Sequence, residues 1–188
     1  MAPATVDISV QPPENPAVTR LAGMDREAEL LQQYLDLERE HVLGILDGFS
    51  DEQLRRPVLP SGWNCLGMVK HLALADEHYW FRCIMAGESL DFFPEEPNAE
   101  WQVSSDESAV DIFALYREEI ERANAIISAT PLDAAPRQRD PHWGAWADRF
   151  TDLRVVMLHM LKETACHAGH LDAAAELIDG RQWIVLGS

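Results

Sequence analysis

Residues 152–180, DLRVVMLHMLKETACHAGHLDAAAELIDG, decide the fold. Along residues 156–177 the core positions recur at alternating spacings of four and three, the periodicity of a helix that buries one face in a bundle. Glu163, His167 and His170 stand within that stripe. They share one helix face because residues three and four apart are neighbours on a helix. The stretch therefore predicts a core helix with polar side chains on its buried side.

A carboxylate and two imidazoles on a buried face are costly unless they are paired or bind something. A metal site is the simplest remedy. Open zinc sites use three protein ligands and leave a position for water or substrate, so a ligand from a facing helix is expected. His71, which lies among apolar residues of the second predicted helix, is the best candidate, with His41 and His78 as alternatives and His142 in a loop.

The last helix offers two ligand pairs. His159 and Glu163 are four residues apart, and so are Glu163 and His167. His159 and His167 are separated by about 12 Å along the helix, so they are not expected to bind the same ion. The spacing leaves both pairs open.

The rest of the chain predicts an all-α, up-and-down four-helix bundle with long connecting loops. Helical patterning covers about residues 25–46, 64–86 and 104–129, in addition to the last helix, and Ser50 is placed to cap a short helix. Ser104 and Glu107 form a capping-box pattern at the start of the third long helix.

Composition and charge narrow the function. The net charge of −17 and the pI near 4.6 argue against binding to nucleic acid or to an anionic membrane. Three cysteines without paired spacing indicate a reducing cytoplasm. The proline-bearing residues 1–20 lack the features of a signal peptide, and they are expected to form a flexible arm before a single domain at 21–188.

Two segments carry a resemblance to a known family. Residues 62–72 (GWNCLGMVKHL) and 163–172 (ETACHAGHLD) resemble the DinB-like family of metal-binding four-helix bundles. Within it, the chain is most similar to the branch that includes mycothiol-dependent maleylpyruvate isomerase and related thiol S-transferases. The similarity runs from about Asp25 to Gly180. It implies one divalent ion at one end of the bundle, usually zinc, with nickel or iron(II) as alternatives.

The resemblance also implies the ligands and the chemistry. The ligand on the second helix corresponds to His71, and the pair on the last helix corresponds to Glu163 and His167, in preference to His159 and Glu163. The implied cosubstrate is mycothiol or a similar small thiol, which attacks an electrophile as its thiolate in a transfer or an isomerisation. His170 is a candidate for orienting a ligand or handling protons.

Two other functions would use the same residues: a non-catalytic metal-binding or stress-response protein, and a metal-dependent hydrolase. The loop before the last helix contains Trp143 and Trp146, which either cover the metal pocket or only pack against the bundle. A homodimer is plausible for such a bundle, although no residue requires it.

Overall fold

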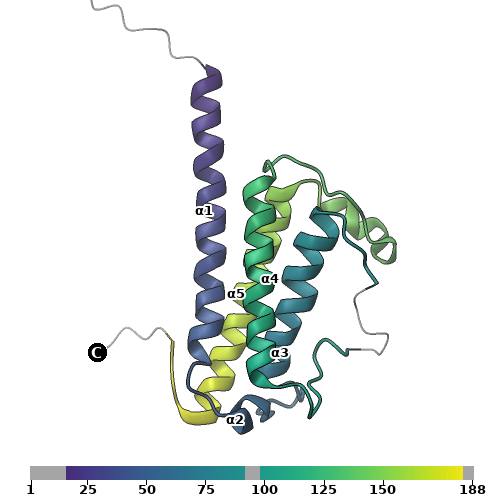
Figure 1. Ribbon diagram of the computed structural model, residues 1–188. Helices are drawn as coiled ribbons and strands as arrows, with labels where there is room; N and C mark the ends of the chain where they lie inside the picture. The colour runs from purple at the N-terminus through teal and green to yellow at the C-terminus, as the bar shows by residue number, and fades with distance from the viewer. Residues whose placement is uncertain (1–15, 92–97, 184–188) are drawn as a thin grey trace, which may run out of the picture.

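The computed structural model describes residues 16–91 and 98–183, and over these the chain is built from helices, turns and loops. The helices in chain order are α1 (Pro16–Ile45), α2 (Asp51–Arg55), α3 (Cys65–His71), η1 (Leu72–Met85), α4 (Ala109–Ala129), η2 (Pro141–Arg149) and α5 (Leu153–Asp179). Because α3 continues directly into η1, the chain forms four long rods: α1, α3–η1, α4 and α5 (Figure 1). The predicted all-α bundle is confirmed.

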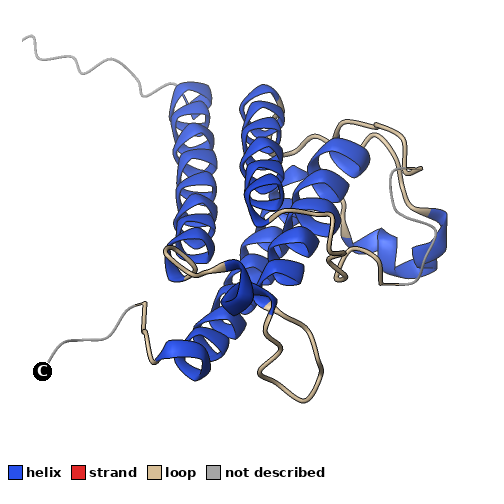
Figure 2. Cartoon of the chain, turned by 60° about the horizontal axis from the view of Figure 1, so that its bottom comes forward, coloured by secondary structure: helices blue, strands red, loops and turns tan. Residues whose placement is uncertain are grey.

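The four rods are arranged in contacting pairs. α1 packs along α5, η1 packs along α4, and α5 also contacts η1. α2 lies at the end of the bundle where α1 ends and α3 begins, and α1 extends past the other rods at the opposite end (Figure 1). The view in Figure 2 shows η2 set to one side of the rods. In the described part of the chain, no helix is both long enough and apolar enough to span a membrane.

The core consists of two apolar clusters with a polar layer between them. The cluster near α2 includes Val42, Leu66, Leu72, Ile112, Tyr116, Ala168 and Leu171. The other cluster includes Leu35, Tyr79, Trp80, Ala123, Val156 and Met160. On each rod, the buried polar residues fall between the two: Arg39 on α1, Asp76 and Glu77 on η1, Glu119 on α4 and Thr164 on α5. The middle of the bundle is therefore polar.

Arg39 occupies the centre of this polar layer and is only 2% exposed. Its guanidinium donates two hydrogen bonds to the Glu77 carboxylate, at 2.7 and 2.6 Å. It also donates to Asp36 at 2.7 Å and to Asn124 on α4 at 2.8 Å. Burial alone would lower the pKa of Arg39, but the Glu77 carboxylate outweighs it and raises that pKa. The Arg39 guanidinium on α1 is therefore ion-paired with η1 and hydrogen-bonded to α4, and it joins the three helices.

Several helix ends agree with the sequence. Ser50 caps α2 through a complete capping box, and Asn64 caps α3 by accepting a hydrogen bond from the Gly67 amide. Gly87 and Gly180 follow η1 and α5 with positive φ values of 80° and 82°, which glycine adopts without strain.

Two helix starts differ from the prediction. α1 begins at Pro16 and not near residue 25; proline is well suited to the first turn of a helix. α4 begins at Ala109, because the Ser108 side chain accepts a hydrogen bond from the Asp111 amide and so caps the helix. The expected box at Ser104 and Glu107 forms only a turn in front of this cap, in which Glu107 accepts from the Ser104 amide at 2.9 Å.

Candidate metal centre

The winding of η1 brings an unexpected carboxylate to the predicted site. Asp76 lies five residues after His71, and on an α-helix these positions would point about 140° apart. η1 is a π-helix, in which residue i pairs with residue i+5; the Ala86 amide, for example, bonds to the Phe81 carbonyl at 2.9 Å. This wider turn places Asp76 on the same side as His71.

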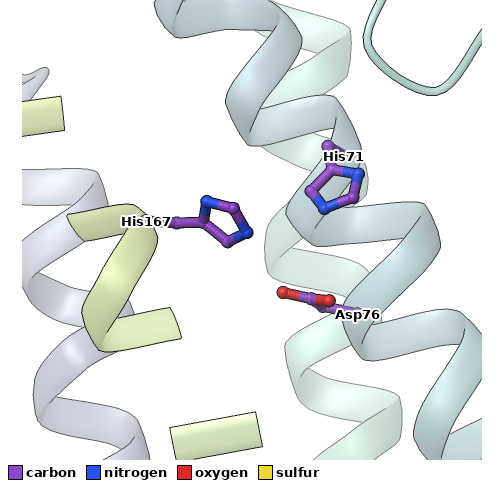
Figure 3. A group of neighbouring side chains, drawn as sticks. All are labelled: His71, Asp76 and His167. Atoms are coloured by element: carbon purple, nitrogen blue, oxygen red, sulfur yellow. The ribbon is translucent and has the colours of Figure 1, made fainter. Parts of the chain in front are cut away.

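His71, Asp76 and His167 form the candidate metal centre. Each offers one ligand atom, and these atoms all lie within 4.8 Å of one another. Figure 3 shows His167 on α5 facing the other two side chains across the gap between rods. The group lies between the two apolar clusters, partway along the rods, and not at the end of the bundle as the resemblance implied.

The chemistry of these three groups fits a cation. Oδ2 of Asp76 is buried without a hydrogen-bond partner, and both histidines turn the ring nitrogen opposite their buried, unpaired Nδ1 toward the centre (Figure 3). A buried carboxylate oxygen without a partner is rare in proteins, and a bound ion is one way to satisfy it. Burial, reinforced by the neighbouring His167, lowers the pKa of His71 to about 3, and burial also lowers that of His167. Both imidazoles are therefore neutral, the form that binds a metal.

Asp76 is electrostatically the least satisfied member. Burial and, secondarily, the nearby carboxylates of Glu77 and Glu163 raise its pKa well above the usual value. Arg39 is already paired with the Glu77 carboxylate, so its positive charge does not serve Asp76. A divalent ion at Asp76 would supply the missing positive charge.

Trp101 fixes the ring of His71. The two rings stack with centroids 3.7 Å apart and an interplanar angle of 15°. The loop that carries Trp101 is held to α3 by Lys70, whose ammonium donates to the Gln102 carbonyl at 2.8 Å and pairs with Glu107 at 2.6 Å. Gly67 makes this approach possible, because a Cβ there would lie 2.2 Å from the Trp101 carbonyl oxygen. The sequence did not predict this role of Trp101, because no pattern in its loop indicates that the ring packs on His71.

The other predicted site residues lie nearby. The Glu163 carboxylate is 3.1 Å from the Lys162 ammonium and 3.6 Å from Nδ1 of His159, and it lies outside the group of three. It lines the same pocket as His71, so its role as a ligand stays a prediction. His170 is exposed, with its ring centroid 5.8 Å from that of His167.

The remaining histidines are engaged elsewhere. His41 on α1 contacts Asp172 at 2.8 Å and stacks on Trp183. His78 faces Glu119 at 3.4 Å, on the α4 side of η1. Neither alternative ligand is therefore part of the group at His71.

A pocket of about 440 Å³ adjoins the centre, a size typical of small-molecule sites. Its lining combines the centre with aromatic residues of η1 and η2: His71, Ala75, Asp76, Tyr79, Trp80, Asp140, Trp143, Trp146, His159 and Glu163. Trp143 also contacts Trp80, with ring centroids 4.7 Å apart, and Trp146 contacts Phe150 at 4.8 Å. The two tryptophans thus both wall the pocket and pack against the bundle.

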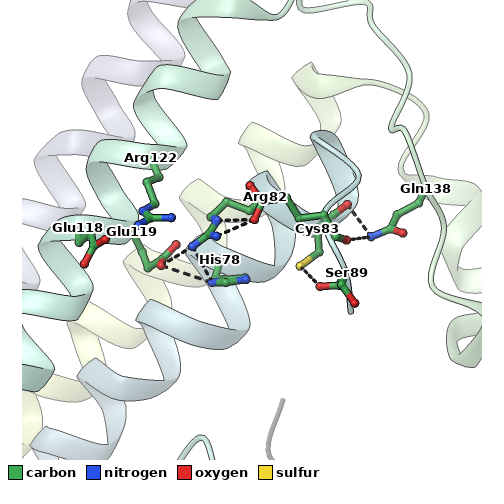
Figure 4. A network of polar contacts seen from close by, with 9 residues as sticks. His78, Arg82, Cys83, Ser89, Glu118, Glu119, Arg122 and Gln138 are labelled. Atoms are coloured by element: carbon green, nitrogen blue, oxygen red, sulfur yellow. Dashed lines mark hydrogen bonds and ion pairs between the residues drawn. The ribbon is translucent and has the colours of Figure 1, made fainter. Parts of the chain in front are cut away.

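The segment leading to η2 is anchored to the end of η1. Gln138 donates to the carbonyls of Cys83 and Glu88, at 2.7 and 2.6 Å. Arg82 holds the same turn through Glu88 and reaches α4 through Glu119, at 2.7 Å (Figure 4). These contacts fix the loop that carries Asp140 and the two tryptophans beside the pocket.

The fold and the site define an all-α bundle with a candidate two-histidine, one-carboxylate metal centre beside an aromatic pocket. The chain matches the mycothiol-S-transferase family over residues 30–180, and it belongs to this family. The match includes every residue of the centre and the pocket, and it confirms the resemblance that the sequence motifs carried. Searches of curated proteins and of solved structures returned no significant match.

Proposed function

We propose that this protein is a metal-dependent enzyme that joins mycothiol, or a similar small thiol, through its sulfur to an electrophile. Membership of the mycothiol-S-transferase family supports the thiol and the reaction class. The single observation that carries the metal dependence is the meeting of one ligand atom from each of His71, Asp76 and His167 within 4.8 Å of one another, with Oδ2 of Asp76 buried and unpaired.

His71 and His167 are the proposed imidazole ligands, and two carboxylates compete for the third place. The geometry favours Asp76, which lies in the group, whereas the family resemblance favours Glu163, one turn before His167 on α5. A divalent ion held there, zinc being the expected one, would lower the pKa of a coordinating thiol so that it reacts as the thiolate near neutral pH.

The residues of the chain supply binding and proton transfer. In the transfer, a sulfur–carbon bond forms, the leaving group departs with its bonding electrons, and the thiol proton goes to a base. His159 lines the pocket and is neutral, because burial lowers its pKa, so it is available to accept a proton. His170 is the other candidate for this role, at the exposed side of His167. The aromatic walls exclude water from one side of the electrophile.

A cytoplasmic setting completes the proposal. Cys65 and Cys83 are buried free thiols, and Cys166 is an exposed one. Unpaired cysteines suit a reducing compartment, in which a small thiol is also kept reduced.

The activity test uses mycothiol and chlorodinitrobenzene with the zinc-loaded protein. Conjugation above the uncatalysed rate should disappear with a chelator and return with zinc. Stoichiometric metal without conjugation of mycothiol, cysteine or glutathione would instead indicate a non-catalytic metal-binding protein. Ester hydrolysis in the absence of thiol would indicate a hydrolase.

Metal retention tests the ligands independently of activity. Replacing His71 by alanine should weaken zinc binding roughly hundredfold or more, since two remaining ligands hold zinc poorly. Asp76→Asn should act similarly, because it keeps the size of the side chain and removes its charge. Glu163→Gln is the matched comparison, and a larger loss there would make Glu163 the third ligand. Zinc retained at the wild-type level in His71→Ala would rule out this centre.

A further inference from the structure

The pocket beside the metal centre has an unusual charge balance. Three of its lining residues carry carboxylates, namely Asp76, Asp140 and Glu163. No residue of the lining is a lysine or an arginine. Even a divalent cation at the centre leaves three negative charges against two positive ones. A ligand that enters the pocket therefore meets an electronegative wall.

Asp140 places one of these charges away from the metal centre. Its side chain is 11% exposed and accepts hydrogen bonds from the Tyr79 hydroxyl at 2.7 Å and the His142 amide at 2.8 Å. Burial would raise the pKa of Asp140, but these bonds and His142 together lower it, so the group is ionised at neutral pH. The His142 ring, 2.9 Å away, is 89% exposed, and water screens any charge it carries.

The other neighbouring groups do not reverse this balance. Lys162 contacts Glu163 at 3.1 Å, but its side chain is 77% exposed and points its charge into solvent. Apart from Ala75 and the two imidazoles, the rest of the wall is the aromatic group of Tyr79, Trp80, Trp143 and Trp146, whose ring faces attract cations and flat apolar bodies.

We infer that this pocket selects electrophiles that carry no negative charge, and that it favours a flat, unsaturated body. The inference rests on the proposed function and names the substrate class for it. A dicarboxylate such as maleylpyruvate would bring its charges against Asp140 and Glu163. The chain is therefore assigned to conjugation of neutral or cationic electrophiles, and not to isomerisation of a dicarboxylic acid.

The test compares the amide and the carboxylate of one chlorodinitrobenzoic acid, which share the ring, the leaving group and nearly the same size. With either compound, mycothiol sulfur bonds to the ring carbon, chloride leaves with the bonding electrons and the thiol proton passes to the buffer. We expect the amide-to-carboxylate ratio of kcat/KM with the zinc-loaded protein to exceed the same ratio of uncatalysed rates by about tenfold. The cause is the repulsion of one unit charge at short range.

Two matched variants assign this preference to the pocket. Asp140→Asn removes the charge and keeps the acceptor for Tyr79, and it should reduce the preference several-fold. Asp148→Asn makes the same change on the same segment, at a carboxylate that pairs with Arg139 and does not line the pocket, and should leave the preference intact. Equal relative rates for both compounds, or equal effects of both variants, would overturn the inference.

Failure of the proposed function gives a different result. If neither compound is conjugated by the zinc-loaded protein, the proposed activity is wrong. Calorimetric titration of the same two compounds then still tests the pocket. Selection by charge is supported if only the amide binds and if Asp148→Asn does not weaken its binding. Equal binding of the carboxylate overturns it.

Discussion

Gly67 sets the position of the His71 ring through the absence of a side chain. The Trp101 carbonyl oxygen lies only 2.2 Å from the position that a Cβ on Gly67 would take, and the Trp101 ring stacks directly on His71. A stacked imidazole has little rotational freedom, so its nitrogens are held in place before any ligand arrives. Such supporting contacts commonly decide the affinity of a metal site.

Gly67→Ala should therefore weaken zinc binding by about tenfold, since the added methyl pushes Trp101 off His71. Helix content, measured by circular dichroism, should be kept because alanine favours helices more than glycine does. Gly169→Ala is the control, as a Cβ at this helical glycine of α5 meets no atom within 4 Å. Competition with a chromophoric chelator measures both affinities; identical values would show that Trp101 does not position His71.

At the scale of elements, the rods and most of their ends were predictable, and the π-helical winding of η1 was not. Caps such as Asn64 and Gly180 are local signals, because a side-chain acceptor or a positive φ acts within a few residues. Asp76 was missed because an assumed α-helical period places it away from His71. The period of a helix depends on its packing against other rods, which no local sequence pattern states.

Competing caps explain the wrong start of α4. Ser104 with Glu107 and Ser108 with Asp111 are two similar pairs four residues apart. The first pair is engaged with two other helices: Lys70 of α3 binds Glu107, and Arg55 of α2 donates to the Ser104 carbonyl at 3.1 Å. These tertiary contacts hold the first pair in a turn and leave the second to begin the helix.

The contact between η1 and α4 should respond to acid through Glu119. Burial would raise its pKa, but His78 and Arg82 outweigh this and lower it from the ordinary 4.5. A carboxylate with a depressed pKa stabilises the fold above its unfolded pKa, and this stabilisation is lost as the pH falls through the lower, folded value. Metal-free protein should thus lose stability below about pH 4.5, in part through Glu119.

Urea unfolding between pH 6 and pH 3 checks this expectation. In Glu119→Gln the acid-induced loss of unfolding free energy should be smaller by about 1 kcal/mol. Glu118→Gln, at the neighbouring position, changes a half-exposed carboxylate whose ion pair with Arg122 contributes little. An equal pH dependence in Glu119→Gln and the wild type would remove Glu119 from the acid response.

On the scale of the whole molecule, the polar layer places a site in the middle of the bundle at a cost in folding free energy. Composition and periodicity predicted a bundle core interrupted on α5, but not that Arg39 and Glu119 continue the interruption on α1 and α4. A charged residue on one helix does not reveal its partner on another, because pairing across rods depends on their relative rotation. Arg39 is therefore an element of the fold that only the assembled bundle explains.

Arg39→Met should destabilise the protein by about 3–5 kcal/mol, because it leaves the Glu77 carboxylate buried without a counter-charge. The double variant Arg39→Met with Glu77→Leu should recover most of this loss, since an apolar pair of similar volume often replaces a buried ion pair without cost. Urea titration gives both values. A single variant that costs less than about 1 kcal/mol would mean that the pair contributes little to the bundle.

The placement of the indole rings gives the molecule an optical consequence. Trp80, Trp143 and Trp146 line the pocket, Trp101 stacks on His71, and Trp63 lies edge-on to His170. Five of the six tryptophans thus surround the proposed chemistry, and only Trp183, which follows α5 and stacks on His41 of α1, lies apart. Intrinsic fluorescence will therefore report ion loading and ligand entry directly, so that both can be followed in real time without attaching a dye.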